Sequence, residues 1–253
     1  MGSNGVKEKR MKECVGKVLS STNYGDFKII KYVSAKEVLV KFLKTGTEVW
    51  CTRKNAFEGG VKDKYFPTIC GVGYYGNALP KRSHPKIERI YNVWSKMIRR
   101  CYDAEYIQFK DYNDCSVSEY FASFEHFSTW YLSQVGSDQN NWQLDKDLLY
   151  KGNRVYSEDT CCIVPPEINN LLRRYTKNSS TCKGVYYNTK LGKFSAHLLG
   201  KYIGLFATEI EAFYAYKEAK ETYIKEVANK WKDKIDPRVY EALMNWTISI
   251  DDK

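Results

Sequence analysis

The sequence predicts an α+β protein built from three small units, and three observations lead to this prediction. Short β-rich runs separated by glycines fill residues 12–80, and apolar residues recur at helical spacing in residues 83–176. Three further strand-like runs precede a long helical segment in residues 181–250. Hydrophobic residues make up 43% of the 253 residues, which is enough to build cores. We therefore expect each range to form its own small unit.

The first unit, residues 12–80, is expected to be a small β-barrel of about five strands. The runs FKIIKYV, EVLVKFL and TEVWCTR are rich in β-branched and aromatic residues, and glycines separate them. In the middle run, Val38, Val40 and Phe42 occupy every second position, which is the period of a strand with one buried face. The run GVGYYG at 71–76 is expected to be a turn that closes the barrel. It leads into a proline-containing loop and not directly into a helix, so we do not interpret it as a dinucleotide-binding loop.

Two amphipathic helices are expected between residues 83 and 135. Ser83 and Pro85 are the residue types of an N-cap and a first turn, and the second helix is expected from about Ser118. Apolar stripes at this spacing are typical of a core, so we assign both stripes to the core and not to a ligand surface. The two stripes are Ile87, Ile90, Tyr91, Trp94, Ile98 and Cys101, and then Tyr120, Phe121, Phe124, Phe127, Tyr131 and Leu132.

The last part of the chain is expected to form a three-stranded sheet and a helix. Residues 140–176 form a compact irregular unit that ends in a short helix, and the runs GVYYN, KFSAHLL and KYIGLF then have the composition of strands. A helix follows from Thr208 to about Lys230. Thr208 and Glu211 have the spacing of a capping box, in which each side chain binds a free backbone N–H of the first turn. A last short helix is expected from Asp236, with Pro237 in its first turn.

Composition favours a polyanionic partner and a reducing compartment. The net charge is +10 and the pI about 9.0, and a basic protein that neutralises phosphates gains free energy by releasing counterions. No apolar run approaches the roughly 20 residues of a membrane span, and the polar N-terminus is not a secretory signal. The eight cysteines form no C-x-x-C pair, so we expect free thiols in a cytoplasm and no structural zinc site.

A cationic stretch without acidic residues points to the C-terminal unit as the binding surface. No Asp or Glu lies between Ile168 and Thr208. In KFSAHLL, alternation places Phe194, Ala196 and Leu198 on one face of the strand and Lys193, Ser195, His197 and Leu199 on the other. A sheet with a helix on one face leaves the other face to water or to a partner. The cations of this stretch are Arg173, Arg174, Lys177, Lys183, Lys190, Lys193 and Lys201.

The segment GVYYNTKLGKFSAHLLGKYIGLFATEIEAFYAYKEA resembles the plant ethylene-response-factor DNA-binding domain of the Apetala-two type. The shared pattern includes Gly184–Val185, Gly192–Lys193–Phe194 and Ala215–Tyr216, in the family's order along this segment. The family reads the major groove with the exposed face of its sheet. The resemblance implies contacts to DNA from Tyr186, Lys193, Ser195, His197 and Lys201. The family's arginines are missing from that face, which lowers the number of bidentate contacts to guanine.

The segment LDKDLLYKGNRVYSEDTCCIVPPEINNLL resembles the HNH unit of phage homing endonucleases, which commonly precedes an Apetala-two module. The family uses a histidine as general base beside one divalent metal ion. Here the histidine position is Lys146, between Asp145 and Asp147, the middle position falls near Thr160, and only Asn169 keeps a family residue type. Lysine is cationic at neutral pH, so it is a poor base and repels a metal ion. The motif is therefore interpreted as degenerate, a scaffold with no cofactor.

The expected function is that of a phage-type protein that binds double-stranded DNA in the cytoplasm of an infected bacterium. Such a protein would descend from a homing endonuclease, lack nuclease activity, and act in regulation, packaging or counter-defence. One alternative is a divergent nuclease that holds Mg²⁺ or Mn²⁺ with Asp145, Asp147 and Asn169. Another is RNA or protein binding, with the N-terminal barrel docking a host or phage protein.

Overall fold

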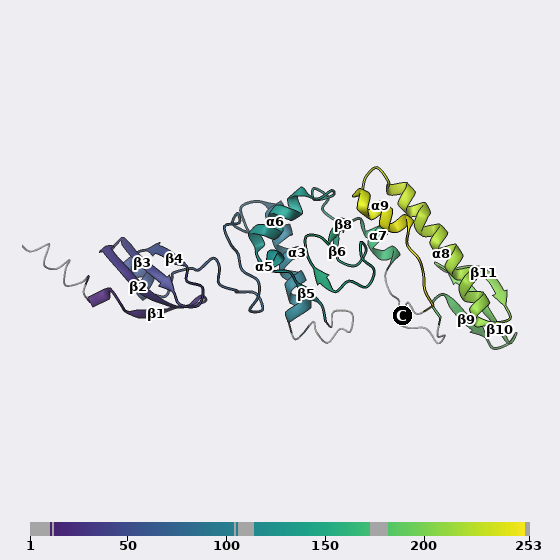
Figure 1. The fold of residues 1–253 in the computed structure, drawn as a ribbon, viewed down its shortest axis with the longest axis horizontal. Helices are drawn as coiled ribbons and strands as arrows, with labels where there is room; N and C mark the ends of the chain where they lie inside the picture. Colours follow the sequence, from purple (N-terminus) through teal and green to yellow (C-terminus); the bar gives the residue numbers. More distant parts are fainter. Residues whose placement is uncertain (1–10, 12, 104, 106–113, 173–181, 251–253) are drawn as a thin grey trace, which may run out of the picture. The chain divides into compact units, whose positions relative to one another are not determined.

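The computed structural model describes residues 11, 13–103, 105, 114–172 and 182–250. It contains both helices and sheets, which confirms the α+β class (Figure 1). The chain forms two compact units. Unit 1 comprises Met1–Tyr131 with Val155–Glu158, and unit 2 comprises Leu132–Arg154 with Asp159–Lys253.

Unit 1 begins with an open antiparallel sheet, not with a barrel. The strands β1 (Val18–Ser21), β2 (Gly25–Ser34), β3 (Glu37–Phe42) and β4 (Glu48–Cys51) pair in sequence order, and among the described residues β1 and β4 do not pair with each other. The predicted five-stranded barrel is therefore wrong. After β4 the chain forms the short helix α2 (Arg53–Phe57), capped by the Thr52 side chain, in place of a fifth strand.

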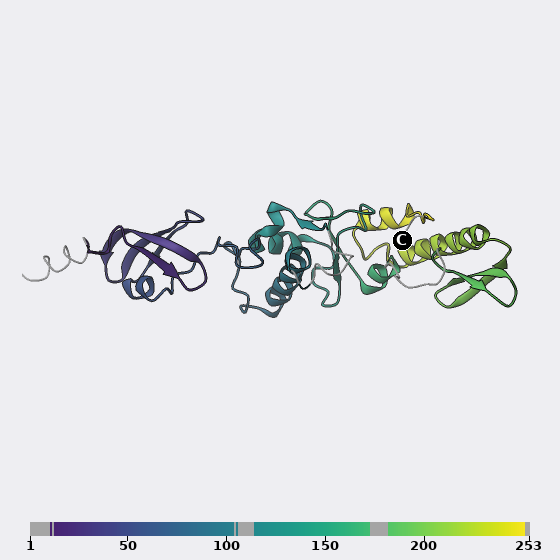
Figure 2. The same ribbon diagram turned by 90° about the horizontal axis from the view of Figure 1, so that it is seen from below.

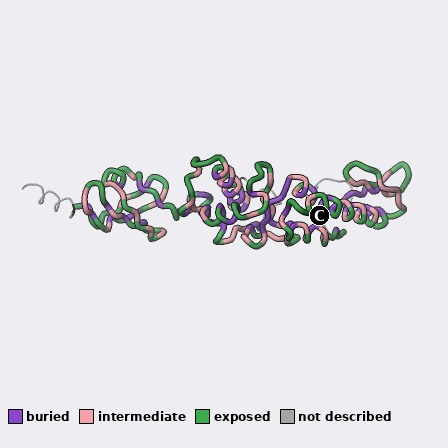
Figure 3. Tube along the Cα trace, turned by 90° about the horizontal axis from the view of Figure 1, so that it is seen from above, coloured by how far each residue is buried: buried purple, intermediate pink, exposed green. Residues whose placement is uncertain are grey.

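One face of this sheet is buried without any closure of the strands. The α2 residue Ala56, together with Val61 and Cys14, packs against the apolar side chains of β2 and β3. Buried positions consequently alternate with exposed or intermediate ones along β3, as predicted. Figure 3 colours the whole chain by burial. The buried strand residues are Phe27, Ile29, Tyr32, Val38, Val40 and Phe42.

The GVGYYG run does not close a barrel, because its backbone pairs with the helical part of unit 1. The Tyr74 N–H donates to the carbonyl of Ala122 (3.0 Å), and the Phe124 N–H donates to the carbonyl of Tyr74 (2.9 Å). A Cβ at Gly73 would lie 2.5 Å from Cδ1 of the buried Ile98, so a larger residue here would have to displace that side chain. The glycines of this run have the spacing G-x-G-x-x-G of a dinucleotide-binding loop. The eight residues that follow are not helical, however, so the helix that such a loop requires is missing.

The predicted helices of the middle region are present, with two differences. Helix α3 (Pro85–Tyr102) is capped by His84, whose Nδ1 accepts the Lys86 N–H (3.1 Å), so the predicted cap at Ser83 is wrong by one residue. The second predicted helix is interrupted by extended backbone at Ser123, which separates α5 (Glu119–Ala122) from α6 (Phe124–Ser133). The expected start near Ser118 is confirmed, and the Ser118 side chain caps α5 by accepting the Phe121 N–H (3.2 Å).

The aromatic stripes of these helices form core, as predicted. Trp94 is fully buried and its Nε1 donates to the carbonyl of Phe121 (2.8 Å). Two members of the predicted stripes, Tyr120 and Leu132, are exposed instead. A short parallel pair of β5 (Ser116–Val117) and β7 (Val155–Tyr156) completes unit 1. The buried aromatic residues are Trp94, Phe121, Phe124, Phe127, Trp130 and Tyr131.

Unit 2 combines an antiparallel strand pair, two short helices and a sheet around one long helix (Figure 2). The pair is β6 (Gln143–Asp145) with β8 (Cys162–Val164), and α7 (Pro166–Leu171) follows it. The predicted strands and helices that come next are confirmed, including the capping box at Thr208. They are β9 (Val185–Asn188), β10 (Lys193–Leu198), β11 (Lys201–Phe206), α8 (Glu209–Trp231) and α9 (Pro237–Met244).

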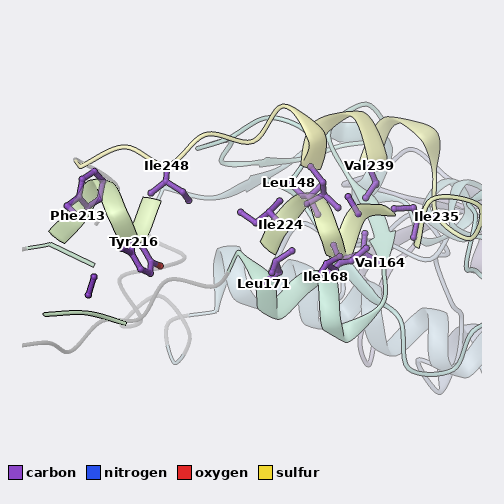
Figure 4. Packing of buried hydrophobic residues seen from close by; sticks show 14 of the residues in the cluster. Leu148, Val164, Ile168, Leu171, Phe213, Tyr216, Ile224, Ile235, Val239 and Ile248 are labelled. Carbon is purple, nitrogen blue, oxygen red and sulfur yellow. The ribbon is translucent and has the colours of Figure 1, made fainter. Parts of the chain in front are cut away.

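A single core joins the parts of unit 2. Figure 4 shows Leu148, Val164 and Ile168 converging on Ile224 of α8 and Val239 of α9. The α7 carboxylate of Glu167 also accepts hydrogen bonds from Lys230 Nζ and Trp231 Nε1, each at 2.7 Å. The strand pair with α7 and the C-terminal sheet therefore pack on the same helix, α8. No described helix is both long and apolar enough to span a membrane.

Candidate nucleic-acid interface

The sheet β9–β10–β11 has one face on α8 and one face that α8 leaves uncovered. Ala196 is fully buried against α8, and Phe194 and Leu198 pack on the same core. This confirms the predicted alternation from Lys193 to Leu198, and the neighbouring positions, such as Lys193 and Ser195, consequently point to the opposite face. Leu199, which was predicted on that face, lies instead in the turn after β10. We call this opposite face the outer face of the C-terminal sheet.

A row of three aromatic rings crosses the outer face, with one ring on each strand. The His197 ring of β10 lies between Tyr186 of β9, 5.4 Å away, and Tyr202 of β11, 5.6 Å away, and both contacts are edge-to-face. Edge-to-face contacts are favourable for aromatic pairs at these separations. Tyr202 and Tyr186 are 62% and 41% exposed, so the row is accessible to a partner.

Backbone and hydroxyl contacts hold His197 in this row. Its N–H donates to the carbonyl of Gly184 (2.8 Å), and its Nε2 lies 3.2 Å from Oγ of Ser195. The Ser195 hydroxyl also lies 3.3 Å from the carbonyl of Tyr186 and can donate to it. Gly184 has a positive φ of 75°, a conformation that favours glycine. The predicted contacts Tyr186, Ser195 and His197 are thus brought together in one network.

The outer face carries positive charge and no acidic residue at its described positions. Lys193 is exposed and pairs across the strands with Asn188. Lys190 is exposed in the β9–β10 turn, where Asn188 Oδ1 accepts its N–H (3.1 Å). Lys183 precedes β9 and is half-buried. The outer positions of the three strands are Tyr186, Asn188, Lys193, Ser195, His197, Tyr202 and Leu205.

Lys201 lies apart from the other predicted contacts. It pairs with Leu198, on the side of the sheet that faces α8, and it borders a groove that also contains Glu218 and Glu226. Tyr202, which was not among the predicted contacts, occupies the outer position in its place. The two-residue turn Leu199–Gly200, with positive φ at both residues, sets this pairing. The further predicted contacts Arg173, Arg174 and Lys177 lie outside the described residues.

The residues at the HNH-like positions form a hydrogen-bonded turn. Oδ1 of Asp145 accepts the N–H groups of Asp147 (2.9 Å) and Leu148 (2.8 Å). Burial, together with the nearby charge of Asp147, raises the pKa of the Asp145 carboxyl to about 6. This oxygen is therefore engaged by the backbone, which is the contact pattern of a turn cap.

Lys146, at the histidine position, is buried within the same turn. Its Nζ donates to the carbonyl of Asn153 (3.2 Å) and lies 3.3 Å from a carboxylate oxygen of Asp147. Asn153 in turn donates to the carbonyl of Lys146 (2.7 Å). Asn169, the remaining candidate, donates to the side chain of Gln143. Over the described ranges, no three His, Cys, Asp or Glu side chains are grouped to hold a metal ion.

The chain matches no protein-family model, no curated protein and no solved structure.

Its eight cysteines are all free thiols, seven of them buried or half-buried and Cys70 exposed.

Proposed function

We propose that this protein binds double-stranded DNA through the outer face of the C-terminal sheet. The observation that supports this is a sheet face that α8 leaves uncovered and whose described positions carry a lysine, three aromatic rings and no acidic residue. A small sheet or ribbon fits the major groove, which is about 12 Å wide. The likeness of residues 184–219 to the Apetala-two domain implies the same face.

Phosphate contacts dominate the proposed binding. Lys190 and Lys193 are exposed at the β9–β10 end of the sheet, where neutralising phosphates releases counterions. The outer face has no arginine to make bidentate contacts with guanine, so little discrimination between sequences is expected. Ser195 and His197 contribute polar atoms that can reach base edges.

We also propose that the HNH-like turn is a structural element of a binding protein and not a nuclease site. Asp145 is engaged by two backbone N–H groups, and the ammonium group of Lys146 stands where a general base would be needed. The competing proposal is a nuclease that uses Mg²⁺ or Mn²⁺ with Asp145 and Asp147.

A plasmid assay separates the two proposals. Supercoiled plasmid is incubated with the protein at about 100 mM salt, with and without Mg²⁺ or Mn²⁺, and run on a gel before and after deproteinisation. We expect a mobility shift that disappears on deproteinisation and leaves the supercoils intact. Metal-dependent nicks that survive deproteinisation, and that are lost in Asp145→Asn/Asp147→Asn, would instead establish the nuclease.

Two lysines on opposite faces of the β10–β11 hairpin provide a matched pair for the proposed interface. Lys193→Ala is expected to weaken duplex binding and to lower the slope of log K against log salt by about one, because one phosphate contact is lost. Lys201→Ala removes the same charge from the face toward α8, so its effect on the slope is expected to be smaller. Equal slopes for wild type and Lys193→Ala, measured by fluorescence anisotropy, would place the DNA elsewhere.

A further inference from the structure

The sheet β1–β4 of unit 1 presents an exposed tryptophan beside lysines on its open face. Trp50 of β4 is 55% exposed, and Nζ of Lys31 lies 5.9 Å from the centre of its ring. The strand register places Leu39 of β3 between them, so Lys31, Leu39 and Trp50 form a row across three strands. This row lies on the face opposite the core, because its neighbours Val38 and Val40 are buried.

The charges of this face leave two lysines available to a polyanion. The next row contains Lys28, Lys41 and Glu48, and Nζ of Lys41 lies 3.6 Å from a carboxylate oxygen of Glu48. Lys28 and Lys31 have no ion-pair partner within the described part of the chain. Asp26 and Glu37 lie on the same face, because their neighbours Phe27 and Val38 are buried, and they stay charged while accepting hydrogen bonds from Ser20 (2.6 Å) and Ser34 (3.3 Å). Among the described residues, neither carboxylate forms an ion pair with Lys28 or Lys31.

The combination of ring and cations on one open sheet face indicates the kind of ligand. An isolated exposed hydrophobic side chain is ordinary and needs no partner. A flat aromatic ring flanked by unpaired lysines is the arrangement on which proteins stack bases while neutralising the phosphates beside them. The bases of a duplex have their faces covered by neighbouring pairs, so a ring in a sheet can stack only on an unpaired base.

We propose that the open face of β1–β4 binds single-stranded nucleic acid, with a base stacked on Trp50 and the adjoining phosphates near Lys28 and Lys31. This site is independent of the proposed duplex interface, since it uses other residues of another unit. Uncharged or cationic peptides are disfavoured as ligands because they would leave both lysines without a counter-charge.

The test measures the affinity of the full chain for fluorescein-labelled dT20 and rU20 by anisotropy. Trp50→Ala is expected to weaken binding about five- to 150-fold, the range expected when the aromatic side chain under one stacked base is removed. Trp50→Phe is expected to recover most of the affinity, because it restores a ring. The ratio of the dT20 and rU20 affinities identifies DNA or RNA as the preferred strand.

Matched variants keep the result specific to this face. Phe57→Ala removes another partly exposed ring near cations, 4.6 Å from the Arg53 guanidinium, but on helix α2, and should leave the affinity within twofold. All measurements are repeated in Lys193→Ala, and duplex affinity is measured in parallel, so that loss of the C-terminal interface is distinguished from loss of this one. The proposal is overturned if wild type binds neither strand, or if folded Trp50→Ala binds both strands within twofold of wild type.

Discussion

Gly184→Ala is expected to destabilise unit 2 by about 3 kcal/mol, because an alanine there meets two separate penalties. The first is the positive φ of 75°, which an L-residue with a Cβ adopts at a cost of about 1 kcal/mol. The second is steric, since the new Cβ would lie 2.1 Å from Cδ2 of Tyr216, a ring buried in the core of the unit. Forcing a methyl group into a packed core costs about 2 kcal/mol.

Gly192→Ala is the matched control for this substitution. Gly192 has a similar φ of 61°, but a Cβ there would meet no atom within 4 Å. We therefore expect it to lose only the backbone contribution, about 1 kcal/mol. Urea denaturation of both variants measures the difference, and equal destabilisation would mean that Tyr216 moves aside freely.

Gly184 also links the stability of unit 2 to the proposed interface, because its carbonyl accepts the N–H of His197. Displacing Gly184 away from Tyr216 stretches this hydrogen bond at the centre of the aromatic row. Hydrogen exchange at the His197 amide is therefore expected to be faster in Gly184→Ala and unchanged in Gly192→Ala. Unchanged exchange in both variants would show that the row tolerates movement of the glycine.

The parts of the fold that local patterns encode were predictable from the sequence. The alternation of apolar residues in β10 correctly predicted that Ala196 is buried, because side chains of a strand point to opposite faces in turn and the apolar ones face the helix. The Thr208 and Glu211 capping box located the start of α8 because its two hydrogen bonds depend on residues three positions apart.

The parts that depend on tertiary contacts were not predictable in the same way. The β-rich runs of residues 12–80 do not reveal whether a fifth strand or a helix covers the sheet, and α2 takes that place. Strict alternation backward from Phe206 would have put Lys201 on the outer face and Tyr202 toward α8. The pairing with β10 instead skips Ile203. This one extra residue in β11 reverses the faces on which the preceding residues, Lys201 and Tyr202, lie.

The stability of unit 2 is expected to rise between pH 8 and pH 10.5 through Lys220 of α8. This lysine is 7% exposed, and its Nζ donates to the carbonyl of Leu171 (2.8 Å), at the last residue of α7. Burial, with a smaller effect from the positive charge of Lys183, lowers the pKa of Lys220 from 10.5 to about 8. In the unfolded chain the lysine stays protonated up to the ordinary pKa, so in this window the unfolded state binds more protons than the folded state.

The sign of the effect follows from that difference in bound protons. Stability increases with pH wherever the unfolded state holds more protons, so the contribution of Lys220 is complete above pH 10.5 and is lost as the pH falls through 8. Each unit of pKa difference corresponds to roughly 1.4 kcal/mol, which gives a change of about 3 kcal/mol across the window.

Lys220→Met isolates this contribution, because methionine keeps an apolar stem in the same place and does not titrate. The free energy of unfolding of wild type minus that of Lys220→Met is expected to increase by about 3 kcal/mol from pH 7.5 to pH 10.5. Lys225→Met, which removes an exposed lysine from the same helix, corrects for the change in net charge. A difference that stays constant with pH would mean that the folded protein keeps Lys220 protonated, so that the carbonyl of Leu171 at the end of α7 offsets the cost of burying the charge.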